Sequence, residues 1–321
     1  MISLEEAIKQ TNANIGAALG NVSGSLGELT SYLGSSTGKG VRMHVLLCAA
    51  MNADGLAPEN AVKAAVAVEL LHMATLVHDD VIDDTPIRRG VETVQRKFGR
   101  KNAVICGDYL LCMSLNTLSG MEFGDGNDTD RLTPLIIRFS RALSSICLGE
   151  YTQNMHNGDL GINLPTYLRI IAGKTAALFY ISAYLGAILG GEEERAARAL
   201  GRYGQRLGIA FQIADDCKDY ESSEEKALKP VGNDIRGGVV TLPLIIALKR
   251  EPALRDLALA AMSSSRSVSG LVAEVRRIGG ADGAREILRR FDAKARLALR
   301  SIAGTKREHL LAILDKALGE T

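Results

Sequence analysis

Residues 78–84 read His-Asp-Asp-Val-Ile-Asp-Asp and close a long apolar run. On a helix, Asp79 and Asp83 lie one turn apart on the same face, and Asp80 and Asp84 do the same beside them. Carboxylates at this spacing repel each other, and at a helix C-terminus the helix dipole also disfavours negative charge. A bound divalent metal ion would offset both effects, so the stretch predicts a metal site at the end of an apolar helix.

The composition favours one large helical protein. The chain has 321 residues, is 46% hydrophobic and carries a net charge of +1, which gives no general attraction for nucleic acid. Apolar residues recur at helical spacing almost throughout, without a run of strict alternation. No linker is long or polar enough to mark a boundary. We therefore expect a single all-α domain over residues 1–321, a bundle of about ten or more helices.

The expected location is the cytoplasm. Five cysteines without a CxxC pair indicate free thiols in a reducing compartment. The start of the chain resembles an amphipathic helix with early acids rather than a signal peptide. No uninterrupted apolar run reaches about 18 residues, so we expect no membrane span.

Proline and glycine give the expected helix ends. Pro58 and Pro86 bracket the helix that carries the acidic stretch, predicted from about 59 to 84. Further helices are expected at 3–32 (one or two), 41–51, 91–97, 101–120, 132–156, 165–190 and 193–220, with polar loops at 34–40 and 221–238.

A second acidic cluster repeats the pattern at residues 211–220. Asp215 and Asp216 are adjacent, Asp219 follows one turn on, and Gln212 lies one turn before Asp216. One such cluster could be an ordinary solvated helix end, but two at the ends of two apolar helices indicate an oxygen-rich site. Such a site suits Mg²⁺, and no His/Cys set with zinc spacing competes with it.

Several cations stand where an anionic ligand would need them. Each alone would be an ordinary surface charge, whereas beside two metal-type clusters they suggest two diphosphates, one bridged to metal and one held by side chains alone. They are Lys39 and Arg42 at a glycine-bearing loop, Arg88 and Arg89 after the first cluster, Lys174 within an apolar helix, and Lys229 after the second cluster.

In this order, the residues resemble the trans-type polyprenyl diphosphate synthases over most of the chain, and most closely the long-chain heptaprenyl and octaprenyl enzymes. The two aspartate-rich motifs are Asp79-Asp80-x-x-Asp83 and Asp215-Asp216-x-x-Asp219. The other matched signatures are Gly38–Arg42, His72, Arg88-Arg89-Gly90, Gly107-Asp108-Tyr109, Lys174-Thr175, Phe211-Gln212 and Lys229–Asp234. A lone DDxxD is a weak signal, but the ordered set is specific.

The resemblance implies the isoprenoid-synthase bundle with a central apolar cavity. It also implies a Mg²⁺-dependent prenyltransferase that ionises an allylic diphosphate, such as farnesyl diphosphate, and joins it head to tail, in trans, to isopentenyl diphosphate. About three Mg²⁺ ions would be held by the six motif aspartates. Asp79, Asp83, Lys174 and Asp215 would be catalytic. Pyrophosphate itself would take the last proton, so no protein base is assigned.

The resemblance also divides the substrate-binding residues. Isopentenyl diphosphate would bind Lys39, Arg42, His72 and Arg89. The allylic diphosphate would lie between the two metal clusters, assisted by Arg88 and Lys174, and the remaining substrate-binding residues would be Thr175, Gln212 and Lys229. Departures from the family pattern are Gly40, Met43, Leu228 and Val239, which often are Arg, Pro, Gly and Lys. None removes a metal ligand, so we expect a catalytic chain.

The helix below the first motif would set product length. Thr75 lies one turn below Asp79 and Leu71 about two, and each turn of about 5.4 Å is close to one isoprene unit. Ala74 and Thr75 are small, so a growing tail could pass them and end at Leu71 or at a facing helix. This predicts a long product, whereas the alternative is that both are small only to permit close helix packing.

Other functions and assemblies are also compatible with the sequence. A short-chain farnesyl or geranylgeranyl diphosphate synthase would share the motifs. A class I terpene cyclase would lack the second DDxxD and the set of Lys39, Arg42 and His72, and a non-catalytic subunit would not need intact acidic clusters. We expect a homodimer, with a heteromer containing a small subunit as the alternative.

Overall fold

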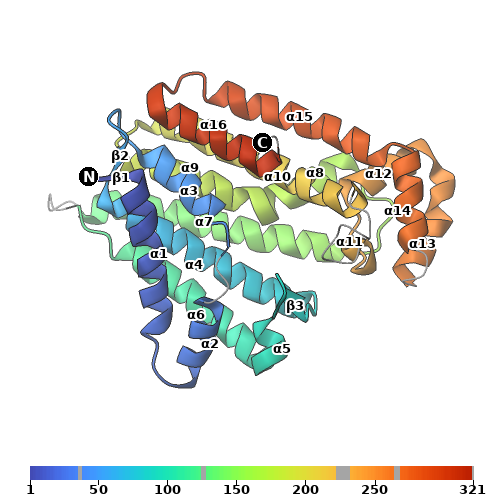
Figure 1. The fold of residues 1–321 in the computed structure, drawn as a ribbon, viewed down its shortest axis with the longest axis horizontal. Helices are drawn as coiled ribbons and strands as arrows, with labels where there is room; N and C mark the ends of the chain where they lie inside the picture. The colour runs from blue at the N-terminus through green and yellow to red at the C-terminus, as the bar shows by residue number, and fades with distance from the viewer. Residues whose placement is uncertain (35–37, 124–127, 222–231, 264–267, 320–321) are drawn as a thin grey trace. The chain divides into compact units, whose positions relative to one another are not determined.

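The computed structural model describes residues 1–321 except 35–37, 124–127, 222–231, 264–267 and 320–321. The described chain is almost entirely helical, as predicted (Figure 1). The α-helices, with a π-helical turn η1 and a 3-10 turn η2, are α1 (Leu4–Gly20), α2 (Gly24–Gly34), α3 (Val41–Ala50), α4 (Glu59–Ile82), α5 (Val94–Phe98), α6 (Arg100–Ser119), α7 (Asp128–Met155), α8 (Leu164–Ile171), η1 (Ala172–Ala176), α9 (Ala177–Leu189), α10 (Glu194–Glu221), α11 (Asn233–Arg236), α12 (Leu242–Arg250), η2 (Pro252–Leu254), α13 (Arg255–Ser263), α14 (Val268–Arg277), α15 (Gly280–Ala298) and α16 (Gly304–Leu318).

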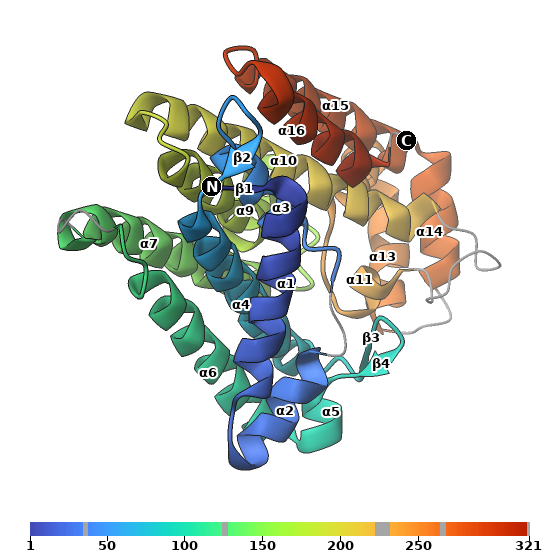
Figure 2. The same ribbon diagram turned by 60° about the vertical axis from the view of Figure 1, so that its left-hand side comes forward.

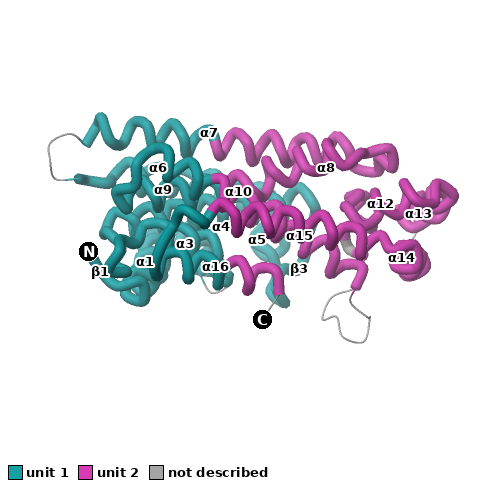
Figure 3. Tube along the Cα trace, turned by 90° about the horizontal axis from the view of Figure 1, so that it is seen from above, with its two compact units in different colours: residues 1–141, 180–201, 299–313 teal, residues 142–179, 202–298, 314–321 magenta. Residues whose placement is uncertain are grey.

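The chain forms two compact units, coloured separately in Figure 3. Unit 1 comprises residues 1–141, 180–201 and 299–313, and unit 2 comprises residues 142–179, 202–298 and 314–321. The first aspartate-rich motif belongs to unit 1 and the second to unit 2. The expectation of one domain over the whole chain stays a prediction.

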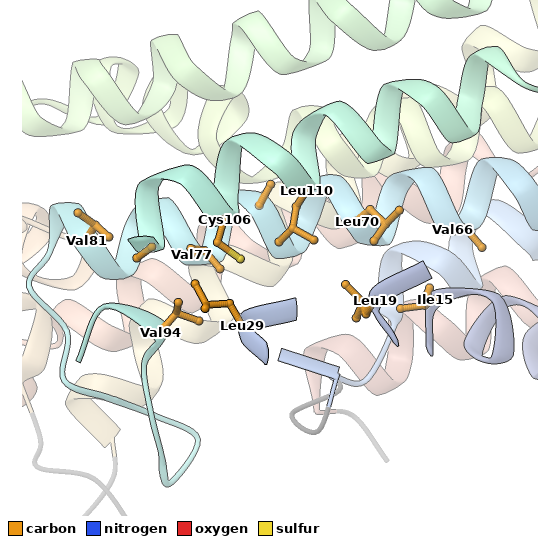
Figure 4. Packing of buried hydrophobic residues seen from close by; sticks show 12 residues of the cluster. Ile15, Leu19, Leu29, Val66, Leu70, Val77, Val81, Val94, Cys106 and Leu110 are labelled. Carbon is orange, nitrogen blue, oxygen red and sulfur yellow. The ribbon is translucent and has the colours of Figure 1, made fainter. Parts of the chain in front are cut away.

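Helix α4 is the centre of unit 1. It packs against α1, α3 and α6, and Figure 2 shows α1 running alongside it. The helix is apolar on nearly all sides because each side meets another helix. Its side chains Val66, Leu70 and Val77 join Cys106 and Leu110 of α6 in one buried cluster (Figure 4), which fixes the end of α4 that carries the first motif.

A short hairpin follows α4. Strands β3 (Ile87–Arg88) and β4 (Val91–Glu92) pair antiparallel, as do β1 (Ile2–Ser3) and β2 (Leu56–Ala57). The two-residue connection Arg89-Gly90 has positive φ at both positions, 53° and 81°, as a tight hairpin turn requires. The predicted helix at 91–97 was therefore wrong at its start: residues 91–92 pair in the hairpin, and α5 begins at Val94.

The predicted single helix at 165–190 is interrupted by η1. Gly149 of α7 approaches this turn so closely that a Cβ there would lie 2.3 Å from the backbone nitrogen of Lys174. A Cβ on Gly173 would lie 2.7 Å from the carbonyl oxygen of Ser145. The two glycines let the backbones meet where the helix widens, and such π turns are common at functional sites.

Three helical segments of the described chain are long and apolar enough to cross a membrane by length and composition alone. They are Glu59–Ile82, Asp128–Met155 and Leu164–Leu189, whose apolar windows are 67%, 28% and 72% buried. The expectation from the sequence, that no apolar run reaches this length without interruption, did not include these segments. In the first and third segments, most of the apolar surface is covered by the protein itself, whereas that of α7 is largely exposed.

Candidate active site

The first aspartate-rich motif ends α4. Asp79 is half-buried, Asp83 and Asp84 are exposed, and Asp80 is buried with 6% of its surface exposed. Arg88 of the hairpin donates from Nε to Oδ1 of Asp80 at 2.7 Å. Desolvation raises the pKa of Asp80 above its usual value, although Arg88 opposes the shift. Asp80 is thus held by the hairpin, while Asp79 is half-buried and Asp83 is exposed.

Four elements of unit 1 bring together the residues predicted to bind isopentenyl diphosphate. Arg42, in the first turn of α3, lies 3.0 Å from His72 Nε2 on α4. A Cβ on Gly38, next to the exposed Lys39, would lie 2.8 Å from Nη1 of Arg89 in the hairpin. Gly38 therefore lies against the hairpin, and α3 meets α4 at Arg42 and His72.

The backbone at the start of α3 explains why position 40 is a glycine. It is the N-cap of α3 with φ 57°, a left-handed conformation that favours glycine. A Cβ there would also lie 2.7 Å from Cε of Met43, so the residue that departs from the family pattern at 43 packs directly over it. Arginine at position 40 would be strained in this backbone.

Desolvation dominates the electrostatics of this cluster. Arg42 keeps some accessible surface, yet its guanidinium lies deep enough for desolvation to lower its pKa to about 10. Desolvation, followed by the charges of Arg42, Arg89 and Arg88, holds the pKa of His72 well below its usual value. His72 is therefore neutral at pH 7. Because arginine only donates, Nε2 of His72 accepts from Arg42 and Nδ1 carries the proton.

Glu69 belongs to the same cluster, although it was not predicted from the sequence as a site residue. Its Oε1 accepts the backbone N–H of Met43 at 3.0 Å. Desolvation raises its pKa, and Arg42 is the strongest influence in the opposite direction. The sequence could have indicated it, because Glu69 lies three residues before His72 and therefore on the same face of an apolar helix.

The second motif ends α10 in unit 2. Asp215 is exposed, Asp219 is half-buried, and Asp216 is buried with 4% of its surface exposed. Tyr167 of α8 donates from Oη to Oδ2 of Asp216 at 2.6 Å, and Gln212 donates from Nε2 to Oδ1 at 2.9 Å. Both oxygens of Asp216 thus accept from protein groups. Tyr167 carried no sequence signal, because it lies 49 residues away in an unremarkable helix start.

Hydrogen bonds connect this motif to η1. Thr175 donates from Oγ1 to Oε1 of Gln212 at 2.7 Å, which orients the amide so that its NH₂ faces Asp216. Desolvation first, then the charges of Asp215 and Asp219, raise the pKa of Asp216 to about 6. Thr175 and Gln212 therefore act together to place the buried carboxylate.

The remaining charges of unit 2 include Glu150, which was not predicted, and Asp234, the last residue of the Lys229–Asp234 signature. Lys174 Nζ lies 2.5 Å from Oε2 of the buried Glu150 on α7. Asp234 donates its backbone N–H to Oδ2 of Asp219 at 3.2 Å. Desolvation and the three motif aspartates hold the pKa of Asp234 well above its usual value. Lys229, predicted to bind substrate, lies outside the described residues.

The side chains of the two motifs do not form a complete magnesium site without a ligand. Among the described residues, no three His, Cys, Asp or Glu side chains converge closely enough to hold a metal ion. Asp83 and Asp215 are exposed and Asp79 and Asp219 are half-buried. Carboxylates are hard oxygen donors, and Mg²⁺ commonly takes one or two of them with water and substrate phosphate oxygens. The residues therefore fit an ion that arrives with a diphosphate.

The three residues predicted to set product length differ in their surroundings. Leu71 and Ala74 are buried, and Ala74 belongs to the apolar cluster that joins α4 to α6. Thr75 is half-buried and donates from Oγ1 to the carbonyl oxygen of His72 at 2.8 Å. Burial of Ala74 is what close helix packing requires, so its small size has that role at least.

Comparison with known proteins identifies the class. Residues 24–277 match the sequence profile of the family described as Polyprenyl synthetase. Heptaprenyl diphosphate synthase component 2 of Bacillus subtilis (strain 168) is 33% identical over 299 residues, which covers 92% of this chain and 82% of that protein.

Solved structures agree. The heptaprenyl diphosphate synthase of Staphylococcus aureus matches with a TM-score of 0.88 and 29% identity, covering 100% of this chain and 99% of that one. The polyprenyl synthase of Caulobacter crescentus CB15, solved with calcium and isoprenyl diphosphate, matches with a TM-score of 0.87 and 29% identity, covering 98% and 94%. The fold and the site thus define an all-α prenyltransferase. The chain belongs to the polyprenyl synthetase family, as the motifs predicted, and this is a family of Mg²⁺-dependent enzymes.

Proposed function

We propose that this prenyltransferase condenses an allylic diphosphate such as farnesyl diphosphate with isopentenyl diphosphate, head to tail and in trans, to make a long-chain polyprenyl diphosphate. The observation that carries the proposal is the convergence of Arg42, His72, Arg89 and the Gly38 loop beside the helix that ends in the first motif. Relatives named as heptaprenyl and octaprenyl diphosphate synthases support a long product.

Isopentenyl diphosphate would be held without metal. Arg42 and Arg89 supply guanidinium groups, Lys39 supplies an exposed ammonium, and neutral His72 supplies an N–H. Because Arg42 is already desolvated and bonded to His72, little side-chain entropy is lost when the diphosphate binds.

The allylic diphosphate would be served by both motifs. Asp79, Asp83, Asp215 and Asp219 would ligate magnesium, about three ions in all, while Asp80 and Asp216 would keep the ligands in place. Magnesium, when bound, would draw off the charge that develops on the departing pyrophosphate. Further contacts to this diphosphate or its tail are assigned to Arg88, Lys174, Thr175, Gln212 and Lys229.

The chemistry needs no protein base. The allylic carbon–oxygen bond breaks and its electron pair leaves with pyrophosphate. The double bond of isopentenyl diphosphate then attacks the allylic cation, forming the new carbon–carbon bond. Loss of one proton from the adjacent carbon to pyrophosphate restores a double bond and balances the reaction. The residues around the cation must exclude water, which would otherwise capture it.

The second copy in a homodimer would bind at α7. Leu148, Tyr151 and Met155 follow each other by three and four residues, and hence share one face of this helix, and each is at least 63% exposed. A heteromer remains the alternative because two relatives are named as component 2 of a heptaprenyl enzyme. Light scattering of the purified chain distinguishes the two: a dimer that is active alone supports the homodimer. A cytoplasmic location and a single functional domain over residues 1–321 belong to the same proposal.

Chromatography of the products tests the proposal. The chain is incubated with farnesyl diphosphate, labelled isopentenyl diphosphate and Mg²⁺, and the extracted products are separated by length. We expect polyprenyl diphosphates well beyond geranylgeranyl. Products that stop at farnesyl or geranylgeranyl diphosphate would favour the short-chain alternative, and the absence of any condensed product would contradict the proposal.

A further inference from the structure

Glu69 connects α3 to α4 at the cluster proposed for isopentenyl diphosphate. It lies on α4, and its carboxylate accepts the backbone N–H of Met43, one of the first-turn N–H groups of α3. The N-cap of that helix is Gly40, which has no side chain to accept this bond. A carboxylate from another helix therefore caps α3, at the end where the helix dipole favours negative charge.

The same carboxylate faces the cations of the cluster. Arg42 precedes Met43 in the chain, and of the charges that act on Arg42 the attraction of Glu69 is the largest. Arg89 also acts on Glu69 as a positive charge. Glu69 thus counters the charge of the arginine that bonds His72.

We propose that Glu69 is a positioning residue for the isopentenyl diphosphate site and that it acts through Arg42. It fixes the first turn of α3 by the Met43 bond and keeps the guanidinium of Arg42 against His72 before the diphosphate arrives. This inference rests on the function proposed above.

Two effects of removing the charge oppose each other. Without Glu69, a bound diphosphate would no longer be repelled by a nearby negative charge, which would tighten binding. However, Arg42 stays protonated at pH 7 even with its lowered pKa, so a desolvated guanidinium without its counter-charge must move toward water. The second effect dominates because it displaces the group that makes the contact, whereas the repulsion acts only at a distance.

The test is the KM for each substrate in Glu69→Gln. Glutamine keeps an oxygen that can accept from Met43 and removes only the charge. We expect the KM for isopentenyl diphosphate to rise about tenfold. The KM for farnesyl diphosphate and kcat should change by less than about twofold. Glu59→Gln is the matched control, since Glu59 is an exposed acid in the first turn of the same helix, and it should leave all three constants unchanged.

A second variant shows whether Glu69 acts through Arg42. Arg42→Met alone should raise the KM for isopentenyl diphosphate, and Arg42→Met with Glu69→Gln should raise it no further, because both charges are then gone and no unpaired charge remains buried. This double variant also answers the question if Glu69→Gln alone folds poorly.

Three results would overturn the inference: an unchanged KM in Glu69→Gln, an equal rise for both substrates, or independent effects that multiply in the double variant. If Arg42→Met itself leaves the KM for isopentenyl diphosphate unchanged, the assignment of the site fails, and that failure is separate from the role of Glu69.

Discussion

The two aspartate-rich motifs share one sequence pattern, but each holds its buried aspartate differently. Asp80 accepts from a cation, Arg88, which reaches it from a hairpin. Asp216 accepts from two neutral groups, Tyr167 and Gln212, and is surrounded by other acids. The buried aspartate of the first motif therefore has a cation as its partner, whereas that of the second has only neutral partners, because the cation of the second motif, Lys218, pairs with the exposed Asp215 at 3.2 Å. The second motif should be the more sensitive of the two to metal and to pH.

The largest expected effect comes from the accessible aspartates. Asp79→Ala and Asp215→Ala should each lower the rate of condensation by about a thousandfold or more, because each would remove a proposed oxygen ligand of the magnesium that would stabilise the departing pyrophosphate. The rate is measured by incorporation of labelled isopentenyl diphosphate. The helical circular dichroism should stay nearly unchanged, since Asp215 is exposed and Asp79 is only half-buried. Full activity in either variant would sink the metal assignment for that motif.

Removing the hydrogen-bond donors of the two buried aspartates compares the motifs directly. Arg88→Met leaves the buried Asp80 without its cation and should lower the free energy of unfolding by about 1–3 kcal/mol, allowing for the partial exposure of Arg88. Tyr167→Phe removes one neutral hydrogen bond from Asp216 and should lower it by about 1–2 kcal/mol. Urea denaturation without metal measures both. A larger loss in Tyr167→Phe than in Arg88→Met would reverse the comparison.

The smallest expected effect is a pH dependence of the metal-free protein. Burial raises the pKa of Asp216 from the usual 3.8 to about 6, so between these values the folded protein binds a proton that the unfolded chain does not. This contribution to stability is present at low pH and is lost as the pH rises through about 6. Asp234, with its pKa also raised, acts in the same direction.

Thermal denaturation in the presence of a chelator measures whether stability falls as the pH rises. From pH 5 to pH 7, the wild-type melting temperature should fall relative to that of Asp216→Asn, which cannot titrate. Mg²⁺ with a diphosphate should recover more stability at pH 7 than at pH 5. Parallel curves for the two proteins would show that Asp216 does not titrate in this range.

The sequence predicts most of the fold because its signals are local. Apolar periodicity, with Pro58 and Pro86, places α4 within two residues of its ends, and the paired aspartates stand at the predicted helix termini. It also groups Lys39, Arg42, His72 and Arg89 by their likeness to one family. Contacts between distant segments are what it does not contain. No local pattern links Tyr167 to Asp216, Glu69 to Met43 or Glu150 to Lys174, since each pair meets only after folding.

Irregular backbone conformation is the second feature that the sequence does not predict. The hairpin after α4 depends on positive φ at Arg89, a conformation that non-glycine residues rarely adopt, so no local pattern in the sequence predicts it. Likewise, the residues Ala172–Ala176 have helical composition, and the π turn arises from the backbone contact between Gly173 and α7. In both places the departure from regular structure positions a predicted substrate-binding residue.

We propose that the aspartates of both motifs hold magnesium for the allylic diphosphate. Isothermal titration of Mg²⁺ into the chain with a sulfur analogue of farnesyl diphosphate, which cannot ionise readily, tests it most directly. We predict tight binding of about three ions only when the analogue is present. That binding should be lost in Asp79→Ala and in Asp215→Ala alike. Tight binding that survives the loss of either aspartate would contradict the claim.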